Sequence, residues 1–100
     1  MNPPLTLNKI VEVLKDELPY LKEKYKVESI SLFGSYVRNE QTSISDLDLL
    51  VTFTETPGFI KFVNLENYLS DELGIEVDLV MKDALKTNIS TRIKEEAIAL

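Results

Sequence analysis

Residues 27–53 read VESISLFGSYVRNEQTSISDLDLLVTF, and this stretch decides how the rest of the chain is interpreted. Its two apolar segments, 27–33 and 47–53, have the length and composition of β-strands. Gly34-Ser35 follows the first segment, and Asp46-Leu47-Asp48 opens the second. The stretch therefore predicts two strands, with a glycine turn at the end of one and a pair of carboxylates at the start of the other.

The flanking sequence predicts helices that cover a sheet. Apolar residues recur at three- and four-residue steps after Pro3-Pro4, which indicates an amphipathic helix that Pro19 kinks or stops. We expect an α+β fold, a small mixed β-sheet packed with helices, in a single domain over residues 1–100. In chain order, the predicted elements are a helix over 7–21, a strand over 27–33, one or two helical turns over 36–40, a loop over 41–45, a strand over 47–53, a helix over 59–73, a strand over 75–81 and a helix over 89–100.

The composition excludes several kinds of chemistry. The chain has no cysteine and no histidine, so thiol nucleophiles, zinc–thiolate sites and histidine bases are absent and any metal must be bound by oxygen. The formal charge of −6 makes stable nucleic-acid binding unexpected. Since the sequence shows no signal peptide and no apolar run of membrane-spanning length, we expect a cytoplasmic protein without a membrane partner.

Asp46 and Asp48 are the first candidates for a metal site. Alternate residues of a strand point to the same face, so the two carboxylates are expected side by side at the edge of an apolar segment. Their mutual repulsion is unfavourable unless a cation or a basic partner offsets it. The alternative is a solvated strand end without any ligand.

Asp78 adds a third carboxylate from another strand. It lies within the apolar segment 75–81, so we expect it to be buried, and a buried aspartate needs a partner. A divalent metal shared with Asp46 and Asp48 would supply one. The alternatives are a helix cap or a salt bridge to a lysine, while Glu76 is expected to face solvent.

Gly34, Ser35 and Arg38 are candidates for phosphate binding. Glycine permits a close approach of the backbone, serine supplies a hydroxyl and an N–H, and a helix that starts after such a turn favours an anion. Arg38 lies one turn further and could reach the same phosphates. The alternatives are an ordinary turn and a surface arginine paired with Glu40. Taken together, three carboxylates beside a phosphate-binding turn suggest a two-metal centre for displacement at phosphorus.

The pattern Gly34-Ser35, ten residues, Asp46-Leu47-Asp48 resembles the signature of the DNA polymerase β nucleotidyltransferase superfamily, and in particular its minimal nucleotidyltransferase (MNT) group. The resemblance implies a polymerase β-like core. It also implies that Asp46, Asp48 and Asp78 bind two Mg²⁺ ions, that Gly34 and Ser35 hold the β- and γ-phosphates of ATP, and that Asp78 accepts the proton of the acceptor. One departure is Asn39, where members of the family often have glycine.

The resemblance also implies a partner. MNT proteins are commonly antitoxins that transfer AMP from ATP to a tyrosine of a HEPN ribonuclease toxin. This role suits a chain of 100 residues, which has little room for its own acceptor-recognition domain. Two alternatives stay open at this point: a non-catalytic antitoxin that neutralises its partner by occlusion, and a nucleotidyltransferase for a small-molecule acceptor.

Overall fold

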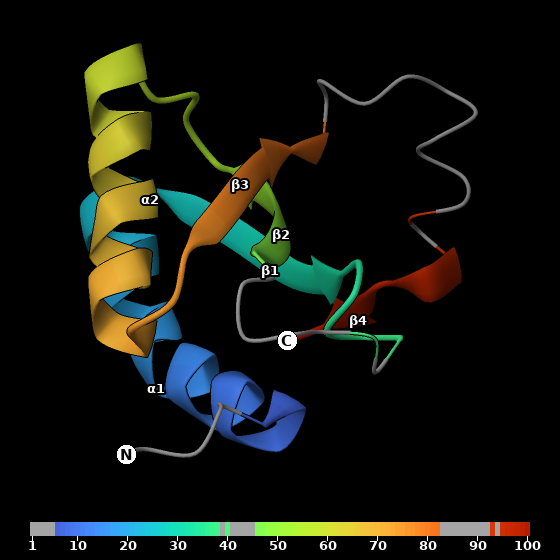
Figure 1. Cartoon of the computed structure of the whole chain (residues 1–100). Helices are drawn as coiled ribbons and strands as arrows, with labels where there is room; N and C mark the ends of the chain where they lie inside the picture. The colour runs from blue at the N-terminus through green and yellow to red at the C-terminus, as the bar shows by residue number, and fades with distance from the viewer. Residues whose placement is uncertain (1–5, 39, 41–45, 83–92, 94) are drawn as a thin grey trace.

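Over the residues that it describes, the computed structural model contains two long helices and one four-stranded sheet (Figure 1). It describes residues 6–38, 40, 46–82, 93 and 95–100. The predicted α+β class, with a small mixed sheet, is confirmed. The elements are α1 (Leu7–Tyr25), β1 (Val27–Phe33), β2 (Leu47–Phe53), α2 (Phe59–Leu73), β3 (Val77–Met81) and β4 (Ile98–Ala99).

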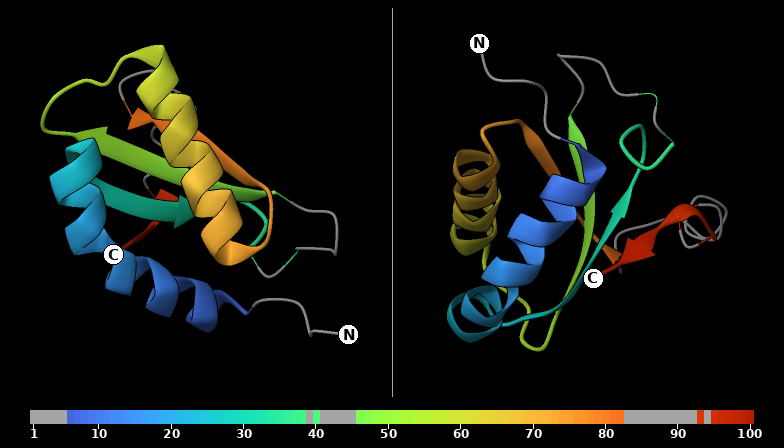
Figure 2. Two further views of the ribbon diagram at one scale, coloured as in Figure 1. Left: turned by 90° about the vertical axis from the view of Figure 1, so that its left-hand side faces the viewer. Right: turned by 90° about the horizontal axis from the view of Figure 1, so that it is seen from below.

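Helix α1 begins at a side-chain cap and continues through its proline. Thr6 Oγ1 accepts a hydrogen bond from the backbone N–H of Lys9 at 3.2 Å, which satisfies one of the free donors at the helix start. The helix passes Pro19 and ends at Tyr25. Figure 2 shows that its two parts run in different directions, as expected where a proline removes a helical hydrogen bond. The predicted kink is therefore present, and the helix extends beyond its predicted range.

The four strands form one mixed sheet in the order β3-β2-β1-β4. Strand β1 pairs antiparallel with both of its neighbours, whereas β2 and β3 are parallel. Helix α2 provides the crossover that a parallel pair requires. As a result, the end of β1 lies beside the beginnings of β2 and β3.

The core fills the space between the sheet and the two helices, which lie on the same face of the sheet (Figure 2). On β2, the buried residues Leu47, Leu49 and Val51 alternate with Asp48, Leu50 and Thr52 on the other face. The fully buried side chains come from both helices and the central strands: Ile10, Leu14, Leu21, Val27, Ile30, Leu32, Leu47, Leu49, Val51, Leu65 and Leu69.

Two predictions for the last third of the chain are wrong in detail. Strand β3 begins at Val77 rather than at residue 75. Ile98 and Ala99, predicted as helix, form β4 instead, because the free edge of β1 offers backbone partners. Leu100 extends this contact by donating its N–H to the carbonyl of Ile30 at 3.1 Å. The predicted loop over 41–45 and residues 89–92 and 94 of the predicted helix lie outside the described residues. None of the described helices is long and apolar enough to cross a membrane.

Candidate active site

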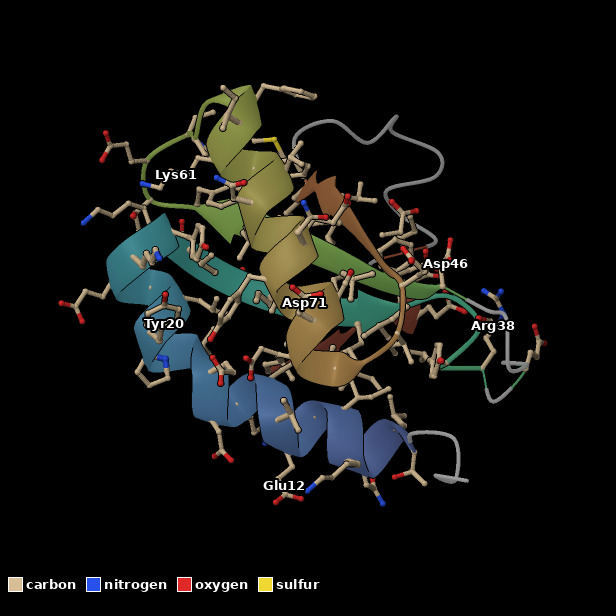
Figure 3. The ribbon with its side chains drawn as sticks, turned by 60° about the vertical axis from the view of Figure 1, so that its left-hand side comes forward. Glu12, Tyr20, Arg38, Asp46, Lys61 and Asp71 are labelled. Atoms are coloured by element: carbon tan, nitrogen blue, oxygen red, sulfur yellow. The ribbon has the colours of Figure 1, made fainter. Side chains whose placement is uncertain are left out.

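Strand pairing brings the predicted site residues to one end of the sheet. Asp48 on β2 is the register partner of Phe33 on β1 and of Asp78 on β3. Gly34 directly follows β1, and Asp46 directly precedes β2. Figure 3 shows Asp46 and Arg38 at this same end of the molecule. Gly34 and Asp78, which are 44 positions apart in the sequence, thus lie at the same end of the sheet.

Asp48 and Asp78 point away from the helices. Leu49 and Leu79, their neighbours along the strands, are buried in the core, and successive side chains of a strand alternate between the two faces. Asp48 is half-buried and Asp78 is exposed. The prediction that Asp78 is buried is wrong, because only one face of β3 is covered. Glu76 is exposed, as predicted.

Helix α2 fixes the backbone around Asp78. Ser70 Oγ accepts a hydrogen bond from the Val77 N–H at 3.0 Å, and Glu66 Oε2 accepts one from the Leu79 N–H at 2.9 Å. Strand β3 is at the edge of the sheet, where such donors lack a strand partner. The Ser70 and Glu66 side chains therefore satisfy the backbone donors on either side of Asp78 at this free edge. No salt bridge joins Asp78 to a lysine in the part of the chain that the structure describes.

The carboxylates at this end interact electrostatically. Partial burial raises the pKa of Asp48 above its ordinary value, and the negative charges of Asp78 and Asp46 raise it further. The Arg38 guanidinium opposes this effect, and Glu96 adds to it. A raised carboxyl pKa means that the ionised form is disfavoured. The site therefore carries an excess of negative charge that a bound cation would relieve.

The turn at Gly34 packs directly against Asp48. Gly34 is buried and has φ +83°, a left-handed conformation that glycine adopts without steric cost. A Cβ at this position would overlap Asp48 Oδ2 and lie 3.0 Å from Cγ of the same residue. The N–H groups of Val37 and Arg38 both donate to the Gly34 carbonyl, at 3.1 and 3.2 Å. The Glu40 N–H continues the turn by donating to the Ser35 carbonyl at 2.8 Å. Residues 35–38 thus form a hydrogen-bonded turn rather than the regular helix whose start would favour a phosphate.

Arg38 links the turn to two glutamates. Its Nε donates to Glu40 Oε2 at 3.0 Å and its Nη1 donates to Glu96 Oε1 at 2.8 Å. The surface pair with Glu40, one of the two interpretations from the sequence, is therefore present. The second oxygen of Glu96 accepts a hydrogen bond from the Gly34 N–H at 3.3 Å.

Glu96 is the site residue that sequence reasoning missed. It lies 62 positions from Gly34, in the segment 89–100 that the sequence predicts as a helix and for which it indicates no candidate site residue. The sequence offers one weak signal, a pair of acids at 95–96 before the apolar residues Ile98 and Leu100. Only the pairing of β4 with β1 brings Glu96 to the turn.

The donor set fits a divalent cation. All candidate ligands are carboxylates, which suit Mg²⁺. Burial first, and the charges of Asp78 and Asp46 second, raise the pKa of Asp48, and a bound cation would favour its ionised form. Among the described residues, no three carboxylates already converge into a metal-binding group. Side-chain rotation would therefore be needed before Asp46, Asp48 and Asp78 shared an ion.

A cavity lies on the open face of the sheet, over β1, β2 and β4. Its volume is about 160 Å³. Leu50 and Thr52 of its wall follow Asp48 at steps of two residues on β2, so all three share one face. The Ser29 and Thr52 hydroxyl oxygens are 2.5 Å apart in a hydrogen bond across this wall. The lining residues are Ser29, Ser31, Leu50, Thr52, Lys82, Ala97 and Ala99.

Known proteins are similar to this chain in sequence. Residues 9–100 match the family model described as a nucleotidyltransferase domain. A chain of Methanocaldococcus jannaschii, provisionally named a protein adenylyltransferase, is 55% identical over 94 residues, which cover 93% of this chain and 96% of that one. The protein adenylyltransferase MntA of Thermococcus cleftensis is 45% identical over 94 residues, which cover 94% of this chain and 95% of that one. The protein therefore belongs to the nucleotidyltransferase domain family and is an enzyme.

Solved structures share the fold. A structure provisionally described as a minimal nucleotidyltransferase matches with a TM-score of 0.81 and 28% identity, covering 99% of this chain and 100% of that one. A structure described as the tri-AMPylated HEPN toxin of Shewanella oneidensis in complex with its MNT antitoxin contains a chain that matches with a TM-score of 0.59 and 28% identity. That match covers 92% of this chain and 66% of the other. The resemblance to minimal nucleotidyltransferases is thus confirmed.

Proposed function

We propose that this protein is a magnesium-dependent protein adenylyltransferase that transfers AMP from ATP to a tyrosine of a HEPN ribonuclease toxin, and thereby acts as the antitoxin. The observation that carries the proposal is the meeting of Asp48 and Asp78, on paired strands, with the Gly34 turn. The names of the similar proteins support adenylyl transfer and a HEPN partner. We propose that residues 1–100 form a single domain and that the reaction takes place in the cytoplasm.

The residues divide into two groups by role. Asp46, Asp48 and Asp78 would hold two Mg²⁺ ions, which would supply charge for the triphosphate and the leaving pyrophosphate and lower the pKa of the acceptor hydroxyl. Gly34, Ser35 and Arg38 would bind the β- and γ-phosphates. Asp78 is exposed, whereas Asp48 is half-buried, so the Asp78 carboxylate is accessible to an acceptor.

The transfer is a single displacement at phosphorus. The tyrosine oxygen attacks the α-phosphorus of ATP and forms the new P–O bond, while the bond to the pyrophosphate breaks. The phenolic proton passes to the Asp78 carboxylate, which then releases it to solvent. We propose that part of the nucleotide or the acceptor ring binds in the cavity lined by Leu50 and Thr52, because these residues lie on the same face of β2 as Asp48.

Intact-mass spectrometry tests the proposal. The product of the neighbouring toxin gene is incubated with this protein, ATP and Mg²⁺, and we expect its mass to increase by one or more AMP units. Asp46→Asn and Asp48→Asn should lower the rate by about a thousandfold, since loss of a catalytic metal removes several kcal/mol of transition-state stabilisation. Asp71→Asn is the matched control, because Asp71 is exposed on α2 (Figure 3).

The other outcomes discriminate between functions. An unchanged toxin mass, together with a stable complex of the two proteins, would show that the antitoxin neutralises the toxin by occlusion and not by AMP transfer. An unchanged mass without a complex, together with pyrophosphate release on adding a small alcohol, would identify a small-molecule transferase. A toxin that is modified equally by Asp48→Asn and by the wild-type protein would refute the assigned site.

A further inference from the structure

Glu96 contacts both ends of the turn that we assign to phosphate binding. One carboxylate oxygen accepts a hydrogen bond from the N–H of Gly34, the first residue of the turn. The other accepts a hydrogen bond from Nη1 of Arg38, the last residue of the turn. We propose that Glu96 is a positioning residue that sets the Gly34 turn and the Arg38 guanidinium for the phosphates of the nucleotide. This inference rests on the proposed function, since it takes ATP as the ligand.

The topology places Glu96 opposite the carboxylates. Strand β1 lies between β2 and β4. Asp48 on β2 packs against Gly34 from one side, while Glu96, three residues before the end of β4, binds the Gly34 N–H from the other side. The turn is thus held from both sides. The Gly34 N–H donates to Glu96, whereas Asp48 lies where a Cβ of Gly34 would be, so the two carboxylates contact different parts of Gly34.

The backbone around Glu96 is itself anchored. Ala97 donates its N–H to the carbonyl of Ile93 at 2.8 Å, and Ile93 is buried. Leu100 is tied to Ile30 of β1. A side chain between two such anchors loses little conformational freedom when it binds Arg38, so the contact is favourable even near the surface.

Arg38 has N–H donors left for a ligand while its side chain is bound to Glu96. A guanidinium has five N–H groups, and the contacts with Glu40 and Glu96 engage Nε and Nη1. The Nη2 group and the second hydrogen of Nη1 can still form a two-point contact with a phosphate. Glu96 is the firmer of the two partners, because 19% of its side chain is exposed against 63% for Glu40.

Nucleotide affinity measures this role. Binding of a non-hydrolysable ATP analogue with Mg²⁺ is followed by calorimetry. We expect Glu96→Ala to weaken binding about tenfold, the value of a hydrogen bond to a charged group, and Glu96→Gln to weaken it less because the amide keeps one acceptor. Glu95→Gln, which makes the same charge change at an exposed neighbour, should leave affinity unchanged. In an Arg38→Ala background, Glu96→Ala should have little further effect.

Three results would overturn the proposal. Tighter binding by Glu96→Gln would mean that the carboxylate competes with phosphate. Full additivity of Glu96→Ala with Arg38→Ala would mean a general loss of structure. Lower kcat with unchanged affinity and an altered pH profile would mean a proton-transfer role.

A nucleotide-free measurement separates this inference from the proposed function. The Gly34 amide and Arg38 Nε–H signals are compared by NMR in the wild-type protein and in Glu96→Gln. We expect both signals to shift, with faster exchange of the Arg38 proton, even if no AMP transfer is ever detected. Unchanged signals would refute the positioning of the turn by Glu96. Shifted signals without nucleotide binding by the wild-type protein would refute the proposed function and, with it, ATP as the ligand of the turn, but not the contact of Glu96 with the turn.

Discussion

The two faces of the sheet use neighbouring residues for opposite purposes. On the face covered by α1 and α2, Leu49 is completely buried in the apolar core. On the open face, one residue earlier in the same strand, Asp48 lies beside Asp78 and its charge is disfavoured. The alternation of a β-strand allows this separation at a spacing of one residue. The covered face provides stability, and the open face carries charge that a ligand must offset.

The largest change in stability is expected on the covered face. Leu49→Ala removes a fully buried side chain and should lower the free energy of unfolding by about 2–5 kcal/mol, through lost burial and the cavity left behind. Thr52→Ala, three residues later and on the open face, should cost less than about 1 kcal/mol. Urea unfolding followed by circular dichroism measures both. Equal losses would contradict the division between the faces.

Gly34→Ala tests the point where the two faces meet. The substitution introduces a side chain at φ +83° and into the space of Asp48, so we expect a loss of about 1–3 kcal/mol in stability. Because Asp48 must shift, AMP transfer should also fall, by about a hundredfold. Gly58→Ala is the matched control, since a Cβ there meets no atom within 4 Å. A fully active Gly34→Ala protein would mean that the close packing against Asp48 is unimportant.

The sequence predicts well the elements that have strong local boundaries. Strands 27–33 and 47–53 and helix 59–73 agree with β1, β2 and α2. Each is bordered by glycine, proline or acidic residues, whose effects on the backbone are local. The Gly34 turn and the carboxylates at 46 and 48 could be located for the same reason. Their chemical roles remain predictions.

What the sequence does not reveal depends on distant partners. Asp78 lies in an apolar segment, yet its exposure follows from the position of β3 at the edge of the sheet. Glu96 reaches Gly34 only because the end of the chain adds a strand to β1. Ile98 and Ala99 have no strong strand signal and take their structure from the edge they bind. The local sequence pattern does not predict which distant segments pair.

The smallest expected effect distinguishes the two faces of the sheet most clearly, because here a substitution in the site is expected to increase stability. Asp48→Asn should increase stability at neutral pH in the absence of divalent cations. The pKa of Asp48 is raised in the folded protein, so the folded state binds its proton more tightly than the unfolded state. Stability is therefore lost as the pH rises from the unfolded carboxyl value, about 4, through the raised folded value.

The Asp48→Asn variant does not lose stability in this way, because its side chain does not titrate. Its melting temperature should exceed that of the wild-type protein at pH 7, and the difference should disappear below about pH 4, where both side chains are neutral. Asp71→Asn, at an exposed position on α2, should show no comparable gain. A gain in stability together with the loss of AMP transfer would show that Asp48 is retained at a cost to the fold. A lower melting temperature for Asp48→Asn at pH 7 would mean that the carboxylate stabilises this end of the sheet, and that its partial burial and its repulsion by Asp78 are not the dominant effects.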